Sequence, residues 1–313
     1  MAYFKCGSGS GNVVKIDGVE VDGDLKLKKK TANVTLPNLP FVLSQGTAVN
    51  FNGVIHVLGG NNTDGRKNHY KLVNNEWVSV STPPCDIYCN SAVVYKDAIH
   101  VVYGTTHYKF NGSTWTTVNS SVSSYSYLLW ILEVLNDKIY AFAWYSSSTK
   151  FAKCYDGSSW ANSTATPNKQ DSIAITNYDN AIHCLGGSGT LTYHYKFNGS
   201  TWTSVSTLPF SLFMGNAKVL NNELHVLGGR ISNMSGFGYE EDYRYVYRDN
   251  VWVQLNDLPI MFSGGASITV DDGVLIAGSY ASLYEKASSS ASLIYPYGKC
   301  AFIIDKTTYE IAS

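Results

Sequence analysis

The amino-acid sequence predicts an all-β fold, a β-propeller of six blades in which each blade is a four-stranded antiparallel sheet. Two observations carry this prediction. The nine residues HYKFNGSTW occur twice, at 107–115 and 194–202, an identity too long for chance. A search for the period then finds a β-rich unit that recurs about every 40 to 50 residues, the spacing typical of propeller blades.

The repeated unit is clearest at its second strand. In chain order the six copies are IHVLGG (55–60), IHVVYG (99–104), IYAFAW (139–144), IHCLGG (182–187), LHVLGG (224–229) and VLIAGS (274–279). An aromatic-rich strand follows each copy, and a large aromatic residue then opens the fourth strand. These residues are Trp77, Trp115, Trp160, Trp202, Trp252 and, in the sixth place, Tyr309. We expect this column to fill the space between neighbouring blades.

The second unit illustrates the four strands of a blade. Its β-like runs are 91–95, 98–103, 107–110 and 114–118, and turn residues such as Asn111-Gly112 separate them. Asn-Gly and Asp-Gly pairs between β-rich runs predict hairpins, because a type I′ turn needs positive φ at both central residues. The first turns of the units are Asn52-Gly53, Lys96-Asp97, Asn136-Asp137, Asp179-Asn180, Asn221-Asn222 and Asp272-Gly273. Each unit is therefore predicted to be one antiparallel meander.

The order of these signals resembles the kelch repeat. A double glycine ends the second strand, a tyrosine lies in the third, and a tryptophan opens the fourth. The resemblance covers residues 41–313 and is strong in units one, four and five. It is weak in unit three, where Ala143 and Trp144 replace the glycine pair, and in unit six, where only Gly278 remains. It implies a six-bladed kelch-like propeller.

Residues 1–30 do not fit the repeat. A Gly/Ser run at 7–11 precedes a hairpin-like piece with Asp-Gly turns at 17–18 and 22–23. A flexible run followed by a small β element indicates an attachment segment. The segment also resembles the leading segments of phage and prophage structural proteins, such as tail or receptor-binding proteins. We therefore expect residues 1–30 to join a larger assembly and residues 31–313 to form the propeller.

Two ways of closing the ring are open. Residues 33–37, within a stretch that imitates a blade ending, can supply the outer strand of the sixth blade from the N-terminus. Alternatively, AFIIDKTTYEIAS (301–313) can supply the last two strands itself, with 308–312 as the fourth. The sequence slightly favours the second arrangement, in which 33–37 adds an edge strand that covers an exposed ladder.

Composition restricts the partners of the chain. Charged residues are 15% of it and the net charge is −1, so it lacks the basic footprint of a nucleic-acid-binding protein. We find no signal peptide and no apolar run of about 18 residues that would insert into a membrane. The expected location is cytoplasmic or virion-associated.

The histidines and cysteines give no sign of a metal or cofactor. All seven histidines fall in two repeat columns, four on second strands and three at the start of third strands, as expected for residues copied with the scaffold. The six cysteines are scattered, and Cys85 and Cys89, four residues apart, have no second pair. We expect packing histidines, reduced cysteines, no metal site and no catalytic residue.

Function is expected on one face of the disc. The second-to-third loops and the loops between blades are long and variable, whereas the opposite face has only tight turns, and binding residues usually lie on variable loops. These loops carry aromatic rings and arginines suited to stacking on sugars or to protein contact. The candidate ligand-binding residues are Arg66, Tyr88, Tyr125, Trp144, Tyr145, Arg230, Phe237 and Tyr239.

These features favour a non-enzymatic binding module, associated with a phage or prophage particle, that recognises a glycan or a cell-surface protein through the variable loops. A first alternative is a sugar-modifying enzyme, because kelch propellers include sialic-acid mutarotases and copper oxidases. Convergence of Arg66, Arg230 and a loop carboxylate over the central channel would support that alternative. A second alternative is an intracellular adaptor for protein interactions.

Overall fold

The computed structural model describes the repeat region together with parts of the N-terminal segment. The described residues are 2–3, 14–16, 19–21, 26–60, 66–88, 90–126, 128–144, 149–167, 173–187, 192–232, 238–260, 262–270, 273–278 and 299–311. They form strands and turns, and no helix occurs among them. Accordingly, these residues offer no helix of the length and apolarity needed to cross a membrane.

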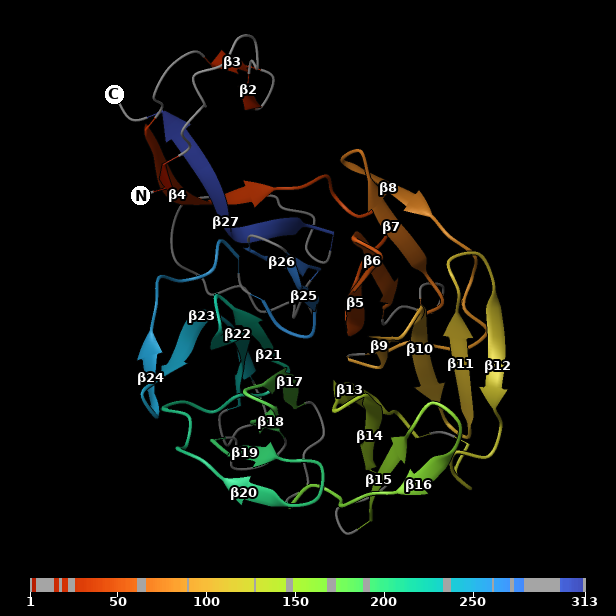
Figure 1. The fold of residues 1–313 in the computed structure, drawn as a ribbon. Coiled ribbons are helices and arrows are strands. Elements are labelled where there is room, and N and C mark those ends of the chain that lie inside the picture. The colour runs from red at the N-terminus through yellow and green to blue at the C-terminus, as the bar shows by residue number, and fades with distance from the viewer. Residues whose placement is uncertain are drawn as a thin grey trace.

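Six antiparallel sheets stand around a common centre, as the sequence predicts (Figure 1). Blade one contains β5 (Gly46–Phe51), β6 (Val54–Gly59), β7 (His69–Val73) and β8 (Glu76–Ser79); blade two contains β9 (Ala92–Tyr95), β10 (Ala98–Tyr103), β11 (Thr106–Phe110) and β12 (Trp115–Asn119). Blade three contains β13 (Ile131–Leu135), β14 (Lys138–Trp144), β15 (Lys150–Tyr155) and β16 (Trp160–Asn162). Blade four contains β17 (Ala174–Tyr178), β18 (Ala181–Leu185), β19 (His194–Phe197) and β20 (Trp202–Ser204); blade five contains β21 (Asn216–Leu220), β22 (Glu223–Ser232), β23 (Gly238–Arg248) and β24 (Val251–Gln254).

The sixth blade combines both ends of the chain. Its strands are β25 (Ala266–Val270), β26 (Gly273–Ala277), β27 (Ala301–Ile311) and β4 (Lys26–Thr35), and the short β1 (Ala2–Tyr3) pairs with the outer side of β4. The slightly favoured arrangement was wrong: residues 308–311 continue the third strand and do not form a fourth. The N-terminal strand closes the ring, because β4 pairs with β27 from Thr35 down to Leu27.

A separate hairpin precedes the closing strand. β2 (Val14–Ile16) pairs with β3 (Val19–Val21), with Ile16 opposite Val19. The first of the two Asp-Gly turns expected there, at 17–18, lies outside the described residues. β3 does not pair with β4 in the described sheets, so the second Asp-Gly pair does not connect neighbouring strands.

The tight turns follow the predicted chemistry in most blades. Both central residues have positive φ at Asn52-Gly53, Asn136-Asp137, Asp179-Asn180 and Asn221-Asn222. Asn111-Gly112 is an exception, because four residues separate the paired Phe110 and Trp115 and only Gly112 has positive φ. The Asn111 side chain accepts hydrogen bonds from the backbone N–H groups of Ser113 (3.0 Å) and Thr114 (2.9 Å), an Asx-type turn.

The hydrophobic core is divided among the seams between blades. Each of six clusters of buried residues joins two neighbouring blades, including one that joins blade six to blade one. The tryptophan column lies half-buried at these seams, as expected. The Trp115 ring centroid lies 5.7 Å from that of His69 in the preceding blade, and Trp160 lies 5.3 Å from His107.

The two histidine columns meet inside the blades. His56 contacts His69 at 2.8 Å between ring nitrogens, and the same distance separates His100 from His107 and His183 from His194. All six rings are buried and pack against aromatic rings of their own or the following blade. Burial lowers the pKa of His56 to about 4. These residues are therefore part of the scaffold, as their repetition predicts.

The glycine that ends the second strand forms a joint between blades. A Cβ atom on Gly186 would lie 2.2 Å from the carbonyl oxygen of Leu212, which precedes blade five. Cβ atoms added to Gly59 and Gly228 would likewise lie 2.2 and 1.9 Å from the carbonyl oxygens of Ile87 and Phe262, respectively. Each of these glycines also has positive φ. The glycine column is thus explained by close approach of the next blade's backbone.

Four of the six cysteines lie among the described residues, and all four are free thiols: Cys85, Cys154, Cys184 and Cys300. Three of them are buried, and burial raises the pKa of Cys85 to about 12. Thiols of this kind are unreactive packing groups. Cys6 and Cys89 lie outside the described residues.

Candidate functional site

The loop face carries a polar and aromatic cluster between blades one and two. The guanidinium carbon of Arg66 lies 5.2 Å from the centre of the Tyr88 ring, and Arg66 Nη1 lies 3.6 Å from Asp86 Oδ2. Tyr88 stacks beside Tyr103, with 6.4 Å between ring centroids and 11° between planes. The Arg66 side chain is 41% exposed, so solvent reaches this cluster, which we call the Arg66 cluster.

Local backbone contacts position the cluster. The backbone N–H of Ile87 donates to the carbonyl of Arg66 at 2.9 Å, which joins the loop of blade one to the segment entering blade two. Ser91 fixes the next turn, since its hydroxyl donates to the Tyr88 carbonyl at 2.6 Å. Partial burial raises the pKa of the Tyr88 phenol. The ring therefore stays neutral, and its hydroxyl can donate as well as accept.

The other predicted site residues are less completely described. Tyr125 is 37% exposed and packs against Phe151 in the next blade, at 5.1 Å between ring centroids. Trp144 and Arg230 lie at the ends of β14 and β22, and Tyr239 lies near the start of β23. The structure describes only the backbone of these three residues, and Tyr145 and Phe237 lie outside the described residues. The described residues bring together Arg66 and Tyr88 from the predicted set.

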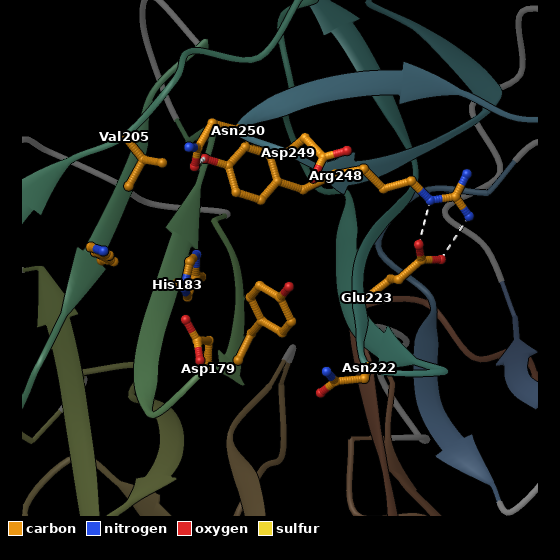
Figure 2. Close-up of a pocket in the computed structure, with 11 residues that line it drawn as sticks. Asp179, His183, Val205, Asn222, Glu223, Arg248, Asp249 and Asn250 are labelled. Carbon is orange, nitrogen blue, oxygen red and sulfur yellow. Dashed lines mark hydrogen bonds and ion pairs between the residues drawn. The ribbon is translucent and has the colours of Figure 1, made fainter.

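Two cavities among the described residues lie beside blade five, and the smaller is on the opposite face, among the tight turns at Asp179, Asn222 and Asn250. The smaller, of about 440 Å³, lies between blades four and five. Figure 2 shows Asp179 and His183 on its blade-four side and Glu223 and Arg248 on its blade-five side. Arg248 donates to both carboxylate oxygens of Glu223, with Nη2 to Oε2 at 2.7 Å. This face, which carries the uniform tight turns, is therefore more hollowed than its sequence suggests.

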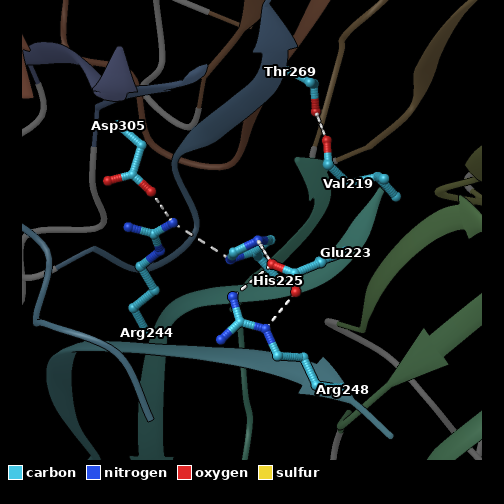
Figure 3. Close-up of polar contacts among 7 residues, drawn as sticks. All are labelled: Val219, Glu223, His225, Arg244, Arg248, Thr269 and Asp305. Carbon is cyan, nitrogen blue, oxygen red and sulfur yellow. Dashed lines mark hydrogen bonds and ion pairs between the residues drawn. The ribbon is translucent and has the colours of Figure 1, made fainter. Parts of the chain in front are cut away.

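The larger cavity, of about 840 Å³, lies between blade five and the closing sixth blade. Figure 3 shows the polar contacts of its wall. Arg244 donates to Asp305 of the closing blade, and its Nη2 lies 3.4 Å from Nδ1 of His225. On the other side of the histidine, Nε2 lies 4.0 Å from Glu223 Oε2. Glu223 and Arg248 line both cavities.

The charged residues of this wall are departures from the repeat. Arg244 occupies the column of His69, His107 and His194 on the third strand. Glu223 begins a second strand where blades two and four have alanine. Alignment of the six units shows both departures, but the predicted site residues lie in the long loops, and neither Arg244 nor Glu223 is in one. The residues around blade five were therefore missed.

A second pair of departures lies on the innermost strands. Val49, Val93, Glu133, Thr176 and Lys218 occupy one column, each opposite the second-strand histidine or its equivalent. Burial raises the pKa of the Glu133 carboxyl and lowers the pKa of the Lys218 amine. The opposite charge of each residue partly offsets the pKa shift of the other. An acid, Glu133, and a base, Lys218, thus lie half-buried on the innermost strands of blades three and five.

No group of three or more metal-binding side chains is found in the part of the chain that the structure describes. Neither the known family models nor the curated protein sequences give a match to this chain. Many solved structures share its fold. One of them, YjhT, is 14% identical and has a TM-score of 0.63, and the match covers 88% of this chain and 99% of YjhT. At this identity the similarity establishes the six-bladed propeller architecture alone.

Proposed function

We propose that this propeller is a non-enzymatic binding module that recognises a glycan through its variable loop face. The observation that carries the proposal is the Arg66 cluster, in which a guanidinium, a carboxylate and two stacked phenols meet at an exposed seam. Its residues come from two different blades, so a rigid scaffold fixes their spacing.

The chemistry of the cluster suits a saccharide. Sugar rings present apolar C–H faces that pack on aromatic rings, and hydroxyls that pair with planar donors and acceptors. Tyr88 and Tyr103 supply the rings, while Arg66 and Asp86 supply the planar polar groups. The exposed Tyr125 of the next blade extends the aromatic surface around the same face.

The order of signals in the repeat supports membership of the kelch type. The resemblance of residues 1–30 to phage structural proteins supports display of the module on a virion or another large assembly. In this proposal the part of the N-terminal segment outside blade six, which includes the β2–β3 hairpin, attaches the module, and the loop face binds the target. A cell-surface protein is the competing target, since arginine and tyrosine are also common at protein interfaces.

The test is binding of the purified chain to an array of bacterial and host glycans, with Tyr88→Ala and Arg66→Ala alongside. Tyr245→Ala is the matched control, because Tyr245 is also half of a stacked aromatic pair, with Phe210 at 4.4 Å, but lies in blade five. We expect both cluster variants to lose a specific glycan signal that the control retains. Absence of glycan binding, or binding that survives both cluster substitutions, would refute the proposal.

A further inference from the structure

The larger cavity beside blade five has the features of a second ligand site. Its volume of about 840 Å³ lies within the range of small-molecule sites. Blade five supplies Glu223, His225, Arg244 and Arg248, and the closing blade supplies Asp305. The cavity lies at the seam between blades five and six, whereas the Arg66 cluster lies between blades one and two, so the two sites are distinct and the inference does not rest on glycan binding at the loop face.

Singular residues gather at this cavity. The histidine pairs recur in blades one, two and four, but Arg244 replaces the third-strand histidine in blade five. Asp305 lies at a register shift between β27 and β4 and has a φ of 54°, in the left-handed region of backbone conformation. Bulges of this kind often redirect a side chain next to a functional site. Here the redirected carboxylate meets Arg244.

Two buried donors in this wall lack acceptors. Because Arg244 donates to Nδ1 of His225, the histidine carries its proton on Nε2. That Nε2 and the Nε of Arg244 are buried and have no hydrogen-bond partner among the described residues. The side chains are 4% and 8% exposed. A buried donor without an acceptor is costly, so a ligand oxygen that accepted a hydrogen bond from either nitrogen would relieve that cost.

The charge of the cavity defines the class of ligand. Two arginines face Glu223, Asp257 and Asp305, and burial lowers the pKa of His225 to about 4, so that it stays neutral near pH 7. A cation would meet the guanidinium groups and an anion would meet the carboxylates. A neutral hydroxyl both donates and accepts, and it leaves the existing ion pairs intact. The remaining polar lining residues are the amides Asn33, Asn221, Gln254 and Asn256.

We propose that this cavity binds a neutral polyhydroxylated ligand of the size of a mono- or disaccharide. Hydroxyl groups would accept from His225 and Arg244 and donate to the carboxylates and amides of the wall. Among the described residues, no phenylalanine, tyrosine or tryptophan lines this cavity, so binding depends on hydrogen bonds and is weaker than at an aromatic platform, with a dissociation constant of about 1 mM.

The experiment is calorimetric titration of the full chain with glucose, glucosamine and glucuronate, three sugars with the same ring and different charge. We expect glucose to bind at least about tenfold more tightly than either charged sugar. Asn256→Ala and Gln254→Ala, which leave both ion pairs in place, should each weaken glucose binding. Asn222→Ala is the control, because Asn222 lines only the smaller cavity.

Tyr88→Ala separates this site from the loop face and should leave glucose binding unchanged. Three outcomes would overturn the inference: no glucose binding, preference for a charged sugar, or glucose affinity that neither amide substitution alters. A result in which Tyr88→Ala alone abolishes glucose binding would also overturn it and assign the sugar to the loop face.

Discussion

Arg244 in blade five forms an ion pair with Asp305 in the closing blade, and the arginine side chain is 8% exposed. The contact crosses the seam beside the strand pair that joins the two ends of the chain. Within blade five, Arg244 takes the place of the second histidine of the pair found in blades one, two and four. The last blade is thereby tied to its neighbour by charge as well as by apolar packing.

Asp305→Asn should therefore lower the free energy of unfolding by about 2 to 3 kcal/mol, because it leaves a buried guanidinium without its counter-charge. Glu223→Gln is the control, since Arg248, the partner of Glu223, is 45% exposed and its ion pair is worth less than about 1 kcal/mol. Urea unfolding of both variants measures the difference. Equal losses in the two variants would contradict the role of Arg244 and Asp305 at the seam.

Acid should unfold the protein through its histidines. Burial lowers the pKa of His56 to about 4 and that of His69 to about 3, from 6.5. The unfolded chain binds these protons at a higher pH than the folded chain does. The stabilisation that comes from keeping the rings neutral is therefore fully present above pH 6.5. It is lost as the pH falls toward the pKa values of the folded state, by up to about 1.4 kcal/mol per pH unit for each ring. Urea midpoints at pH 7, 6 and 5 report the slope.

Blade three provides the control for this pH dependence, since it has Tyr140 and Ala152 in the two histidine columns. The double variant His100→Tyr and His107→Ala copies that arrangement into blade two. We expect a shallower loss of stability between pH 7 and pH 5 than in the wild type. An unchanged slope would mean that this pair does not take up protons on unfolding.

Gly186→Ala should destabilise the fold more than Gly53→Ala. Both glycines have positive φ, so alanine costs about 1 kcal/mol at either position. At Gly186 the new methyl group also meets the Leu212 carbonyl at 2.2 Å, whereas nothing lies within 4 Å at Gly53. We expect an additional loss of about 2 kcal/mol at Gly186, measured as a shift in thermal unfolding. Similar losses would show that the joint between blades is not tight.

Trp202→Ala should lower the free energy of unfolding by about 3 kcal/mol, the low end for a large aromatic residue, because the ring is half-buried. The ring stacks on Phe197 at 4.9 Å and its indole N–H donates to the Thr164 carbonyl at 3.0 Å. Val253→Ala is the control, since that side chain on the neighbouring outer strand is 40% exposed. If the tryptophan variant were as stable as the control, the seam packing described here would be wrong.

Most of the fold could be predicted from the sequence because each blade repeats the same local signals. The closure could not, because the sequence of 301–313 is compatible with two strands, the second at 308–312, as well as with one. In the structure β27 contains a bulge with positive φ at Asp305 and continues to Ile311. The fourth place is then free for β4. Pairing between distant segments is decided by register, which local turn signals do not report.

The candidate site was only partly predictable. Arg66 and Tyr88 were expected on the same face because both lie in long loops, but their contact depends on the way that two blades meet. The cavities beside blade five arise from Glu223, Arg244 and Arg248, which lie on or beside regular strands. Loop length gives no indication of such residues. Departure from the repeat column is the better signal for them.

The most direct test of the proposed function is a crystal structure of the chain bound to the glycan with the strongest signal on the array. Our account predicts that the sugar contacts Tyr88 and Arg66, with the Asp86 carboxylate within hydrogen-bonding distance of a hydroxyl. A glycan bound only at the tight-turn face, or on the outer strands, would contradict it.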